Sequence, residues 1–560
     1  MRVVRRSGGL SVRAVAGTYV VMLGIDLAEA ECEGLLGFTI HRTDHTAGEA
    51  GYLTGMKAFA ETDPGFPPGA VYSTDQHPIQ SFQWADYSAK PEHKYTYRVL
   101  ARGGTPIGLE TLAEVSVPIT TESPTTGLQD VFFNRGVAAS QEYVRRFGDR
   151  TPDKVGPIPT DYLKNPAFAW LSRGLYEALV DLVESAQPGT DSLRVAAYEF
   201  AFRPFLQVLK TAVDRGVDIQ IVYDGREDNK GLPGRRNRAA VQEVGLEDVC
   251  TERTQPVSAI SHNKFIILLR NGAAEAVWTG GTNFSEGGIF GHSNVAHFVE
   301  DPDVADQFLQ YWNALNDDPD DATLTSLVES ISPLPKTKKP PKGTTVVFSP
   351  RADLSALDLY AAYAKTATQG LMMTFAFGMN DAFKSVYRTS EAPFRLALLE
   401  AKTRPMKPGP ARDAEEKAIQ DLRNMKENVF AVGSMISTNK IDGWVKERLS
   451  GLNSNVRYVH NKFMLIDPLG NDPIVIAGSA NFSVASTKDN DENMLIVRGD
   501  TRVADIYLGE FMRLWSHHSF RESLQWRSPN DRPKPLRTDE WWRDAFGDTE
   551  QSVRRVFFAP

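Results

Sequence analysis

Two stretches of the chain carry the same set of side chains that could act on a phosphate. The first covers residues 262–285 and the second residues 460–483; each opens on His-Asn-Lys-Phe and closes on Gly-x-x-Asn-Phe-Ser. A lysine ammonium can bind a phosphate oxygen, a neutral imidazole can attack as a nucleophile, and its protonated form can act as an acid. If the copies face each other, two imidazoles, two ammoniums and two amides surround one phosphorus. The repeated residues are His262, Lys264 and Asn283 in the first copy and His460, Lys462 and Asn481 in the second.

The apolar runs beside these residues predict the strands that position them. Residues 463–466 and 474–477 of the second copy are typical of two buried neighbouring strands. His460 and Lys462 are two residues apart, so on an extended strand both point to one face. One copy therefore supplies half of a phosphate site, and the duplication favours a shared site over two unrelated strand ends.

With these motifs the sequence resembles the phospholipase D superfamily, whose signature is H-x-K-x4-D followed by G-S-x-N. The first copy has Leu269 at the aspartate position and Gly281 at the serine position, which affects a supporting role and leaves the His/Lys/Asn core intact. Tyrosyl-DNA phosphodiesterases of this superfamily also lack that aspartate. The second copy matches in full, with His460, Lys462, Asp467, Gly478, Ser479 and Asn481.

The resemblance implies one active site per chain and a two-step mechanism that requires no metal and no cofactor. One histidine attacks phosphorus and forms a covalent phosphohistidine. The other protonates the leaving alkoxide and then takes a proton from water. The lysines and asparagines stabilise the negative charge on the phosphoryl oxygens. The predicted catalytic residues are therefore His262, Lys264, Asn283, His460, Lys462 and Asn481, with supporting roles for Asp467, Ser479 and Glu492.

The resemblance also bears on which histidine is the nucleophile. Glu492 lies eleven residues past Asn481, where a bacterial nuclease of the family carries a glutamate that pairs with the catalytic histidine. The matching region of the first copy offers only Ser293 and Asn294. The two halves are thus electrostatically unequal. The resemblance to the family favours His262 as the nucleophile, and the sequence alone leaves the assignment open.

The repeat extends beyond the motifs and predicts an α/β fold. The resemblance implies two phospholipase D-like α/β half-domains in a pseudo-twofold arrangement. An all-β sandwich similar to fibronectin type III or immunoglobulin-like modules precedes them, since the N-terminal region consists of short apolar or alternating runs separated by turns. The predicted units are the sandwich at 1–125, the first half at 126–332, a Pro- and Lys-rich linker at 333–343, the second half at 344–528 and a tail at 529–560.

Several elements outside the motifs can also be predicted. Residues 170–186 have apolar side chains at helical spacing and predict one helix that packs on a sheet. Both copies open a later helix on Val-Ala-Asp, and we expect these helices to end near Trp312 and Trp515. Trp541 and Trp542 of the tail predict an anchor that docks on the body of the protein.

Charge and composition narrow the class of substrate. The chain has 560 residues and a net charge of −9, which argues mildly against a broad nucleic-acid surface. The basic segments 229–238 and 402–407 keep a nucleic-acid substrate open. The leading hypothesis is a phosphodiesterase that acts on phospholipid head groups. The alternatives are a nuclease on the same scaffold and a non-catalytic binding protein.

The remaining expectations concern location and partners. Cys32 and Cys250 suggest free thiols in a reducing compartment, so we expect a cytoplasmic protein, with secretion not excluded. The chain lacks a run of about 18 apolar residues, and peripheral membrane contact stays open. The apolar N-terminal run is interrupted by Gly and Thr, which favours a strand over a signal peptide. We expect the sandwich to be a spacer, docking surface or lid whose protein partner is unknown.

Overall fold

The computed structural model describes most of the chain, and some predicted segments fall outside the described residues. These segments are 229–232 of the basic loop, residue 405 of the second basic segment and the start of the tail, 529–533. The helices in the described part of the chain include none whose length and hydrophobicity would let it span a lipid bilayer. The described ranges are 1–65, 71–126, 128–136, 141–148, 150–156, 162–227, 233–256, 259–404, 406–434, 458–525 and 534–560.

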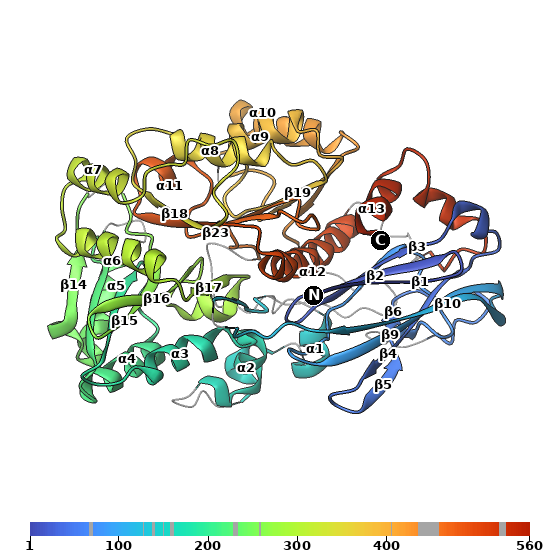
Figure 1. Cartoon of the computed structure of the whole chain (residues 1–560), viewed down its shortest axis with the longest axis horizontal. Coiled ribbons are helices and arrows are strands. Elements are labelled where there is room, and N and C mark those ends of the chain that lie inside the picture. The colour runs from blue at the N-terminus through green and yellow to red at the C-terminus, as the bar shows by residue number, and fades with distance from the viewer. Residues whose placement is uncertain are drawn as a thin grey trace.

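The N-terminal region forms two antiparallel four-stranded sheets that pack face to face (Figure 1). Alternation places Tyr95, Tyr97 and Val99 of β9 in the core between the sheets. The first sheet has the order β1 (Arg2–Ser7), β2 (Leu10–Ala16), β3 (Val21–Asp26), β8 (Gln83–Asp86), and the second β10 (Gly108–Thr120), β9 (Lys94–Thr105), β4 (Gly37–Asp44), β5 (Glu49–Tyr52). A short pair joins β6 (Thr54–Gly55) to β7 (Tyr72–Ser73). The similarity to fibronectin type III modules stays a prediction.

The rest of the chain builds two seven-stranded mixed sheets with the same strand order. In each sheet the last three strands run parallel and the other neighbours antiparallel. The first order is β11 (Gln129–Phe133), β17 (Val295–Val299), β16 (Ala273–Gly280), β15 (Lys264–Arg270), β12 (Asp191–Ala197), β13 (Asp218–Asp224), β14 (Cys250–Arg253). The second is β18 (Gly343–Ser349), β24 (Glu492–Arg498), β23 (Ile474–Gly478), β22 (Phe463–Ile466), β19 (Gly370–Phe375), β20 (Phe394–Leu399), β21 (Asn428–Val432). The duplication read from the motifs thus covers two whole sheets.

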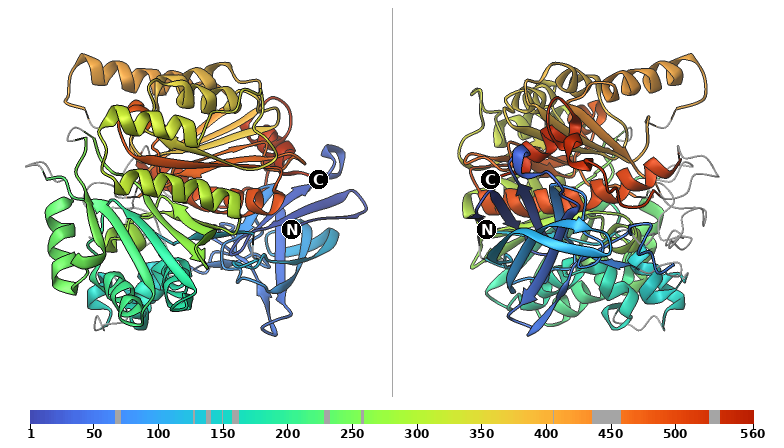
Figure 2. Two further views of the ribbon diagram at one scale, coloured as in Figure 1. Left: turned by 60° about the vertical axis from the view of Figure 1, so that its left-hand side comes forward. Right: turned by 90° about the vertical axis from the view of Figure 1, so that its right-hand side faces the viewer.

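Helices pack against these sheets in both halves (Figures 1 and 2). The helices of the first half are α1 (Gln141–Phe147), α2 (Pro166–Ser172), α3 (Leu175–Ser185), α4 (Arg203–Asp214), α5 (Gly234–Val244), α6 (Pro302–Asn316) and α7 (Asp321–Ile331). Those of the second half and tail are α8 (Ser355–Ala364), α9 (Asp381–Thr389), α10 (Pro410–Arg423), α11 (Val484–Lys488), α12 (Thr501–Gln525) and α13 (Glu550–Phe558). Gly234 opens α5, so residues 234–238 of the predicted basic loop are helical.

One hydrophobic core joins the sheets of the two halves. It includes Phe265 and Phe308 from the first half and Phe463 and Phe511 from the second, all fully buried. Full burial of such a side chain contributes about 1.5–3 kcal/mol relative to exposure, so the halves stabilise each other directly. α12 lies centrally in Figure 1 and contacts β2 of the sandwich, β11 of the first half and strands of the second half.

Two helix predictions require correction. The single helix predicted over 170–186 is wrong, because α2 and α3 are separated by Arg173 and Gly174, whose φ angles of 53° and 91° are left-handed. The second Val-Ala-Asp helix does not end near Trp515 but continues to Gln525 as α12. Helical spacing alone did not show the break, since apolar residues continue at the same period on both sides.

The tail docks mainly on the sandwich. Trp541 and Trp542 are buried and belong to the same hydrophobic cluster as the core of the sandwich. The Trp541 indole N–H donates to the carbonyl of Leu35 at 2.8 Å. α13 lies against β3 of the sandwich and β20 of the second half. The tail therefore ties the sandwich to the α/β body, which the sequence prediction of a docking anchor did not specify.

Candidate active site

The two motifs meet through backbone contacts that cross between the halves. The N–H of His262 donates to the carbonyl of Asp491 at 2.9 Å, and the N–H of His460 donates to the carbonyl of Ser293 at 3.2 Å. Each histidine is thus hydrogen-bonded to the segment that follows the asparagine motif of the other half. Both histidines precede strands β15 and β22, so their predicted place on the strand itself is wrong. Isolated bridges join the residue before each histidine to the opposite half, Ser261 to Asp491 and Val459 to Ser293.

The side chains of the two histidines are also held across the halves, by different groups. His262 Nδ1 lies 2.8 Å from Glu492 Oε2. His460 Nδ1 lies 2.9 Å from Asn294 Oδ1. Glu492 and Asn294 each lie eleven residues after the asparagine of their own motif. One imidazole therefore has a carboxylate as its partner and the other has a neutral amide.

The motif histidines and lysines form one buried cluster. His262 and His460 are each 5% exposed, and Lys264 and Lys462 each 1%. The groups lie close enough for their charges to interact: Lys264 and His262 both lower the pKa of His460. The structure thus brings together the four basic groups on which the predicted phosphate site depends.

The two lysines are positioned by their own motifs. Lys264 Nζ donates to the carbonyl of His262, and Lys462 Nζ donates to the carbonyl of His460 at 2.7 Å. Burial lowers the pKa of Lys264 to about 7 and that of Lys462 well below its ordinary value. A bound anion would stabilise both ammonium forms, so the cluster is suited to a phosphate group.

Burial also keeps both imidazoles neutral. It lowers the pKa of His262 to about 4, although the Glu492 carboxylate acts in the opposite direction. It lowers the pKa of His460 well below its ordinary value, and the charge of Lys462 lowers it further. The carboxylate partner of His262 corresponds to the neutral amide of Asn294 at His460, which is the electrostatic inequality expected from the sequence.

The two motif asparagines differ in their surroundings. Asn283 Nδ2 donates to Glu199 Oε2 at 3.0 Å. The side-chain amide of Asn481 makes no hydrogen bond within the described residues, where its backbone N–H donates to Ser486 Oγ at 3.2 Å. The Oδ1 atoms of both asparagines are buried and unpaired in the same described part of the chain. The second-half amide is therefore the freer of the two to bind a phosphoryl oxygen.

Glu492 and Ser479 lie together in the site, as their predicted supporting roles require. Burial raises the pKa of Glu492, but the charges of His262 and Lys264 and a hydrogen bond from Ser479 outweigh it and hold that pKa below its ordinary value. Ser479 Oγ also accepts the backbone N–H of Asn493 at 3.0 Å. Glu492 is thus an anion whose position is fixed from several sides.

Asp467 is not brought into the site. It follows the far end of β22, and its carboxylate accepts the backbone N–H groups of Thr368 at 2.9 Å, Gln369 at 2.7 Å and Gly370 at 3.1 Å. It therefore stabilises the turn that leads into β19. The matching Leu269 is 5% exposed in the hydrophobic core, so the first copy loses a fold-supporting group and no part of the site.

The sequence analysis missed a third imidazole beside His460. The rings of His292 and His460 lie 4.4 Å apart between centroids, and His292 is 1% exposed. Asn294 Nδ2 donates to the carbonyl of Gly288 at 2.7 Å and lies 3.0 Å from His292 Nδ1. Because the carbonyl can only accept, the amide oxygen faces His460, whose Nδ1 must carry the proton. A lone histidine outside the repeat gave no sequence signal.

A tyrosine and a glutamate after β12 were also missed. The Tyr198 ring packs edge to face on His262, with 4.9 Å between centroids, and Lys264 Nζ lies 5.2 Å from the centroid of the same ring. Glu199 follows and contacts Asn283. Both residues stand at the end of a strand adjacent to a motif strand, a position that could have marked them as candidates.

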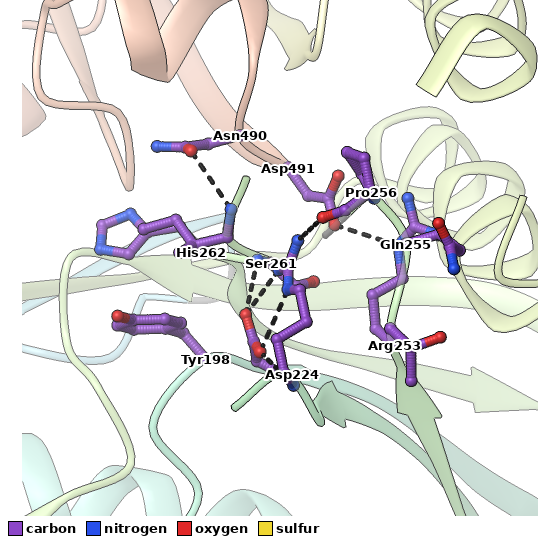
Figure 3. A network of polar contacts seen from close by, with 12 residues as sticks. Tyr198, Asp224, Arg253, Gln255, Pro256, Ser261, His262, Asn490 and Asp491 are labelled. Carbon is purple, nitrogen blue, oxygen red and sulfur yellow. Dashed lines mark hydrogen bonds and ion pairs between the residues drawn. The ribbon is translucent and has the colours of Figure 1, made fainter. Parts of the chain in front are cut away.

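A buried ion network lies beside the start of the first motif (Figure 3). Asp224 accepts the backbone N–H of Ser261 at 2.8 Å and pairs with Arg226 at 2.5 Å. Arg253, which is fully buried, pairs with Asp491 at 3.2 Å although the two lie 238 residues apart. Burial raises the pKa of Asp224 to about 6. The network fixes the two segments that meet at Ser261 and Asp491. Ion pairs between residues so distant in sequence leave no local sequence signal.

Comparison with known families agrees with this geometry. The family model described as "Cardiolipin synthase, PLD-like domain" matches residues 179–315 and 364–515, which is just over half of the chain. The chain therefore belongs to this phospholipase D-like family. The predicted resemblance and the predicted fold class, two phospholipase D-like α/β halves after an all-β region, are confirmed.

Individual relatives are more distant. A mitochondrial cardiolipin hydrolase of Xenopus laevis is 38% identical over 61 residues, which is 11% of this chain and 27% of that protein. The chain thus matches only about a quarter of the length of this curated relative.

Solved structures are similar to parts of the chain. A phosphatidylserine synthase of Haemophilus influenzae Rd KW20 is 11% identical, with a TM-score of 0.43, covering 64% of this chain and 88% of that one. The phospholipase D family member Nuc of Salmonella typhimurium is 27% identical, with a TM-score of 0.21, covering 25% and 85%. A yeast tyrosyl-DNA phosphodiesterase is 16% identical, with a TM-score of 0.32, covering 57% and 87%.

Proposed function

We propose that the protein is a phosphodiesterase of phospholipase D type that hydrolyses phospholipid head groups through a covalent phosphohistidine. The observation that carries the proposal is the crossed pairing of His262 with Glu492 and His460 with Asn294 around two buried lysines. Such a cluster suits an anionic phosphorus centre and provides two imidazoles with unequal partners.

His262 is proposed as the nucleophile. Glu492 holds its Nδ1, so the proton stays there and the lone pair of Nε2 is available to attack phosphorus. The carboxylate also balances the positive charge that the ring gains when the N–P bond forms. The depressed pKa of His262, about 4, keeps the ring neutral and nucleophilic at ordinary pH. The geometry thus supports the choice that family habit favoured.

His460 is proposed as the general acid and base. As an imidazolium it donates the Nε2 proton to the leaving oxygen, which departs with the P–O bonding electrons when the His262 N–P bond forms. The neutral His460 then takes a proton from water, whose oxygen attacks phosphorus while the N–P bond breaks. His262 is thereby restored. The bound phosphate raises the otherwise depressed pKa of His460 and allows it to enter the cycle protonated.

Lys264, Lys462 and Asn481 are proposed to stabilise the equatorial phosphoryl oxygens, with Asn283 in a secondary role. Two ammoniums in a water-poor site can supply the positive charge that many phosphoryl-transfer enzymes take from a metal ion. We therefore expect hydrolysis to persist in EDTA.

A phospholipid substrate is favoured by the net charge of −9 and by the family description. Such a substrate requires peripheral contact with a membrane surface. A nucleic-acid phosphodiester is the second candidate: Arg235 and Arg236 are exposed at the start of α5, and the charge of Arg236 reaches Tyr198 in the site. Cys32 and Cys250 are unpaired thiols, in line with our proposal of a cytoplasmic location.

The test compares substrates and variants in one buffer that contains EDTA. Phosphatidylcholine vesicles are assayed for choline release, and plasmid and single-stranded DNA for strand cleavage. Choline release that disappears in His460→Ala supports the proposal, whereas DNA cleavage without lipid hydrolysis selects the nuclease. If the wild type releases no more choline and cuts no more DNA than His460→Ala does, the residual activity does not come from this site, and a non-catalytic binding protein is supported.

A further inference from the structure

Glu199 places a carboxylate in the phosphate site that the proposed mechanism does not use. Its Oε2 accepts from Asn283 Nδ2 at 3.0 Å and from Ser285 Oγ at 2.6 Å. The side chain is half-buried, and its charge acts on Lys264, where it opposes the effect of burial on the lysine pKa. The Asn283 amide that would contact phosphate is therefore also hydrogen-bonded to the Glu199 carboxylate.

The other wall of the site carries no charge at the matching position. Ala197 of β12 pairs with Lys264, and Met373 of β19 pairs with Met464 in the same antiparallel register. Continued by two residues, that register sets Phe375 level with Lys462, so Phe377 occupies the place of Glu199. Phe377 is 39% exposed, and its ring centroid lies 6.5 Å from that of His460. The site thus has an acidic wall in the first half and an apolar wall in the second.

The charges in the site distinguish two kinds of phosphate. Two ammoniums, Lys264 and Lys462, face two carboxylates, Glu492 and Glu199. A phosphodiester carries one negative charge, whereas a phosphomonoester carries nearly two above its second pKa of about 6. Inorganic phosphate has a somewhat higher second pKa and is also mainly a dianion at pH 8. A carboxylate next to the phosphate repels the dianion about twice as strongly as the monoanion.

We propose that Glu199 is a specificity-determining residue that makes the site select monoanionic phosphodiesters and reject dianionic phosphomonoesters. The inference rests on the proposed function, because it assumes that the cluster binds phosphate. Hydrolysis of a head group leaves a phosphomonoester, which becomes a dianion as it loses its proton. Glu199 then repels the product and promotes its release, while the diester substrate, with its single charge, is retained.

The test measures binding and does not depend on turnover. Inorganic phosphate and dimethyl phosphate are titrated calorimetrically into the wild type and into Glu199→Gln at pH 8 and pH 5.5. Glutamine keeps the shape and an oxygen acceptor for Asn283 and Ser285 but removes the charge. At pH 8 we expect Glu199→Gln to bind inorganic phosphate about ten-fold more tightly and dimethyl phosphate about three-fold more tightly. At pH 5.5, where phosphate is a monoanion, the two gains should become equal.

Two further variants keep the test decisive. Glu199→Asp retains the charge and should keep the wild-type preference, even if its contacts with Asn283 are altered. Phe377→Leu changes the opposite wall without a charge and should leave the ratio of the two affinities unchanged. Equal gains for both ligands at pH 8 would overturn the role of Glu199 and leave the proposed function standing. A wild type that binds neither ligand, at either pH, would overturn both.

Discussion

In the first half of the site, His262 is held by a carboxylate that the second half supplies; in the second half, His460 is held by an amide that the first half supplies. The two sheets have the same strand order, so the scaffold alone imposes no difference between the histidines. The difference in what holds the two Nδ1 atoms comes from one position in each copy, Glu492 against Asn294. A duplicated fold can therefore give two identical side chains different chemical tasks by changing only their partners.

The largest expected loss of activity comes from substituting the two histidines, which are proposed to act in different steps of the reaction. His262→Asn should lower turnover by a factor on the order of 10⁴ or more and abolish the phosphoenzyme. His460→Asn should lose about 10²–10⁴ with phosphatidylcholine but far less in the first step with bis-p-nitrophenyl phosphate, whose leaving group needs no acid. Rapid acid quench with detection of phosphohistidine, together with the p-nitrophenol burst, gives the measurement. A burst in His262→Asn and none in His460→Asn would reverse the assignment.

The next largest effect comes from substitutions of Glu492 and Asn294 that give both histidines the same kind of hydrogen-bond partner. Glu492→Gln should lower kcat by about 10²–10⁴, because the imidazole of His262 loses the anion that balances its charge. Asn294→Asp should raise the pKa of His460, since a carboxylate favours the imidazolium. The pH profile of kcat/KM for choline release should then extend to higher pH in Asn294→Asp. An unchanged profile in Asn294→Asp, with Glu492→Gln fully active, would remove the basis of the comparison.

Activity and folding stability should respond to pH in opposite directions, and activity should rise as the pH falls from 8. The proposed mechanism needs a protonated His460, whose pKa burial depresses, and charged Lys264, whose pKa is about 7. Between pH 8 and pH 6, kcat/KM should therefore rise, by up to about ten-fold per pH unit for each of these two groups that must gain a proton. The rise should stop where His262 becomes protonated, near pH 4. A maximum of kcat/KM at pH 8 or above would contradict this.

Folding stability should move in the opposite direction. Burial lowers the pKa of His262 to about 4 and of His292, His297 and His518 to about 3, so the unfolded chain binds more protons below pH 6.5. Stability present above pH 6.5 is lost as pH falls, by up to about 2 kcal/mol for each imidazole at pH 5. Asp224 and Asp505, each with a pKa near 6, act the other way but are outnumbered by these imidazoles. Melting temperatures recorded from pH 5 to pH 8 should fall toward acid pH.

The smallest effect concerns the aspartate that only the second half retains. Asp467→Asn removes a carboxylate that accepts three backbone N–H groups, so the free energy of unfolding should fall by about 1–3 kcal/mol. Because Asp467 lies at the far end of β22 from His460, kcat should stay within about two-fold of the wild type. Urea unfolding and choline release measure the two quantities. Asp358→Asn, exposed on α8, serves as the matched control.

The parts of this molecule that repeat could be predicted from the sequence. A shared phosphate site is the simplest explanation for two copies of the motif, so the sequence predicts that His262, Lys264, His460 and Lys462 lie together. The structure places these four residues in one buried cluster. The alternation of β9 likewise predicts a strand with one buried face. Local periodicity and repetition were sufficient for both.

Several features that occur only once could not be predicted. His292 and Glu199 have no motif around them, and their roles arise only where the two halves meet. The break at Arg173 and Gly174 depends on backbone angles that the apolar period does not encode. Asp467 was assigned to the site because it belongs to the family signature, although its bonds are those of a turn.

The exchange of partners between the copies has a consequence for how the enzyme is assembled. Neither half contains a histidine together with the group that orients it, so a half that folded alone would present an imidazole without a fixed tautomer. Catalytic competence therefore reports the docking of the two halves. A cut in the connecting residues 333–342, which form no helix or strand, should be tolerated for as long as the halves remain in contact. Separately expressed halves should recover activity only on mixing.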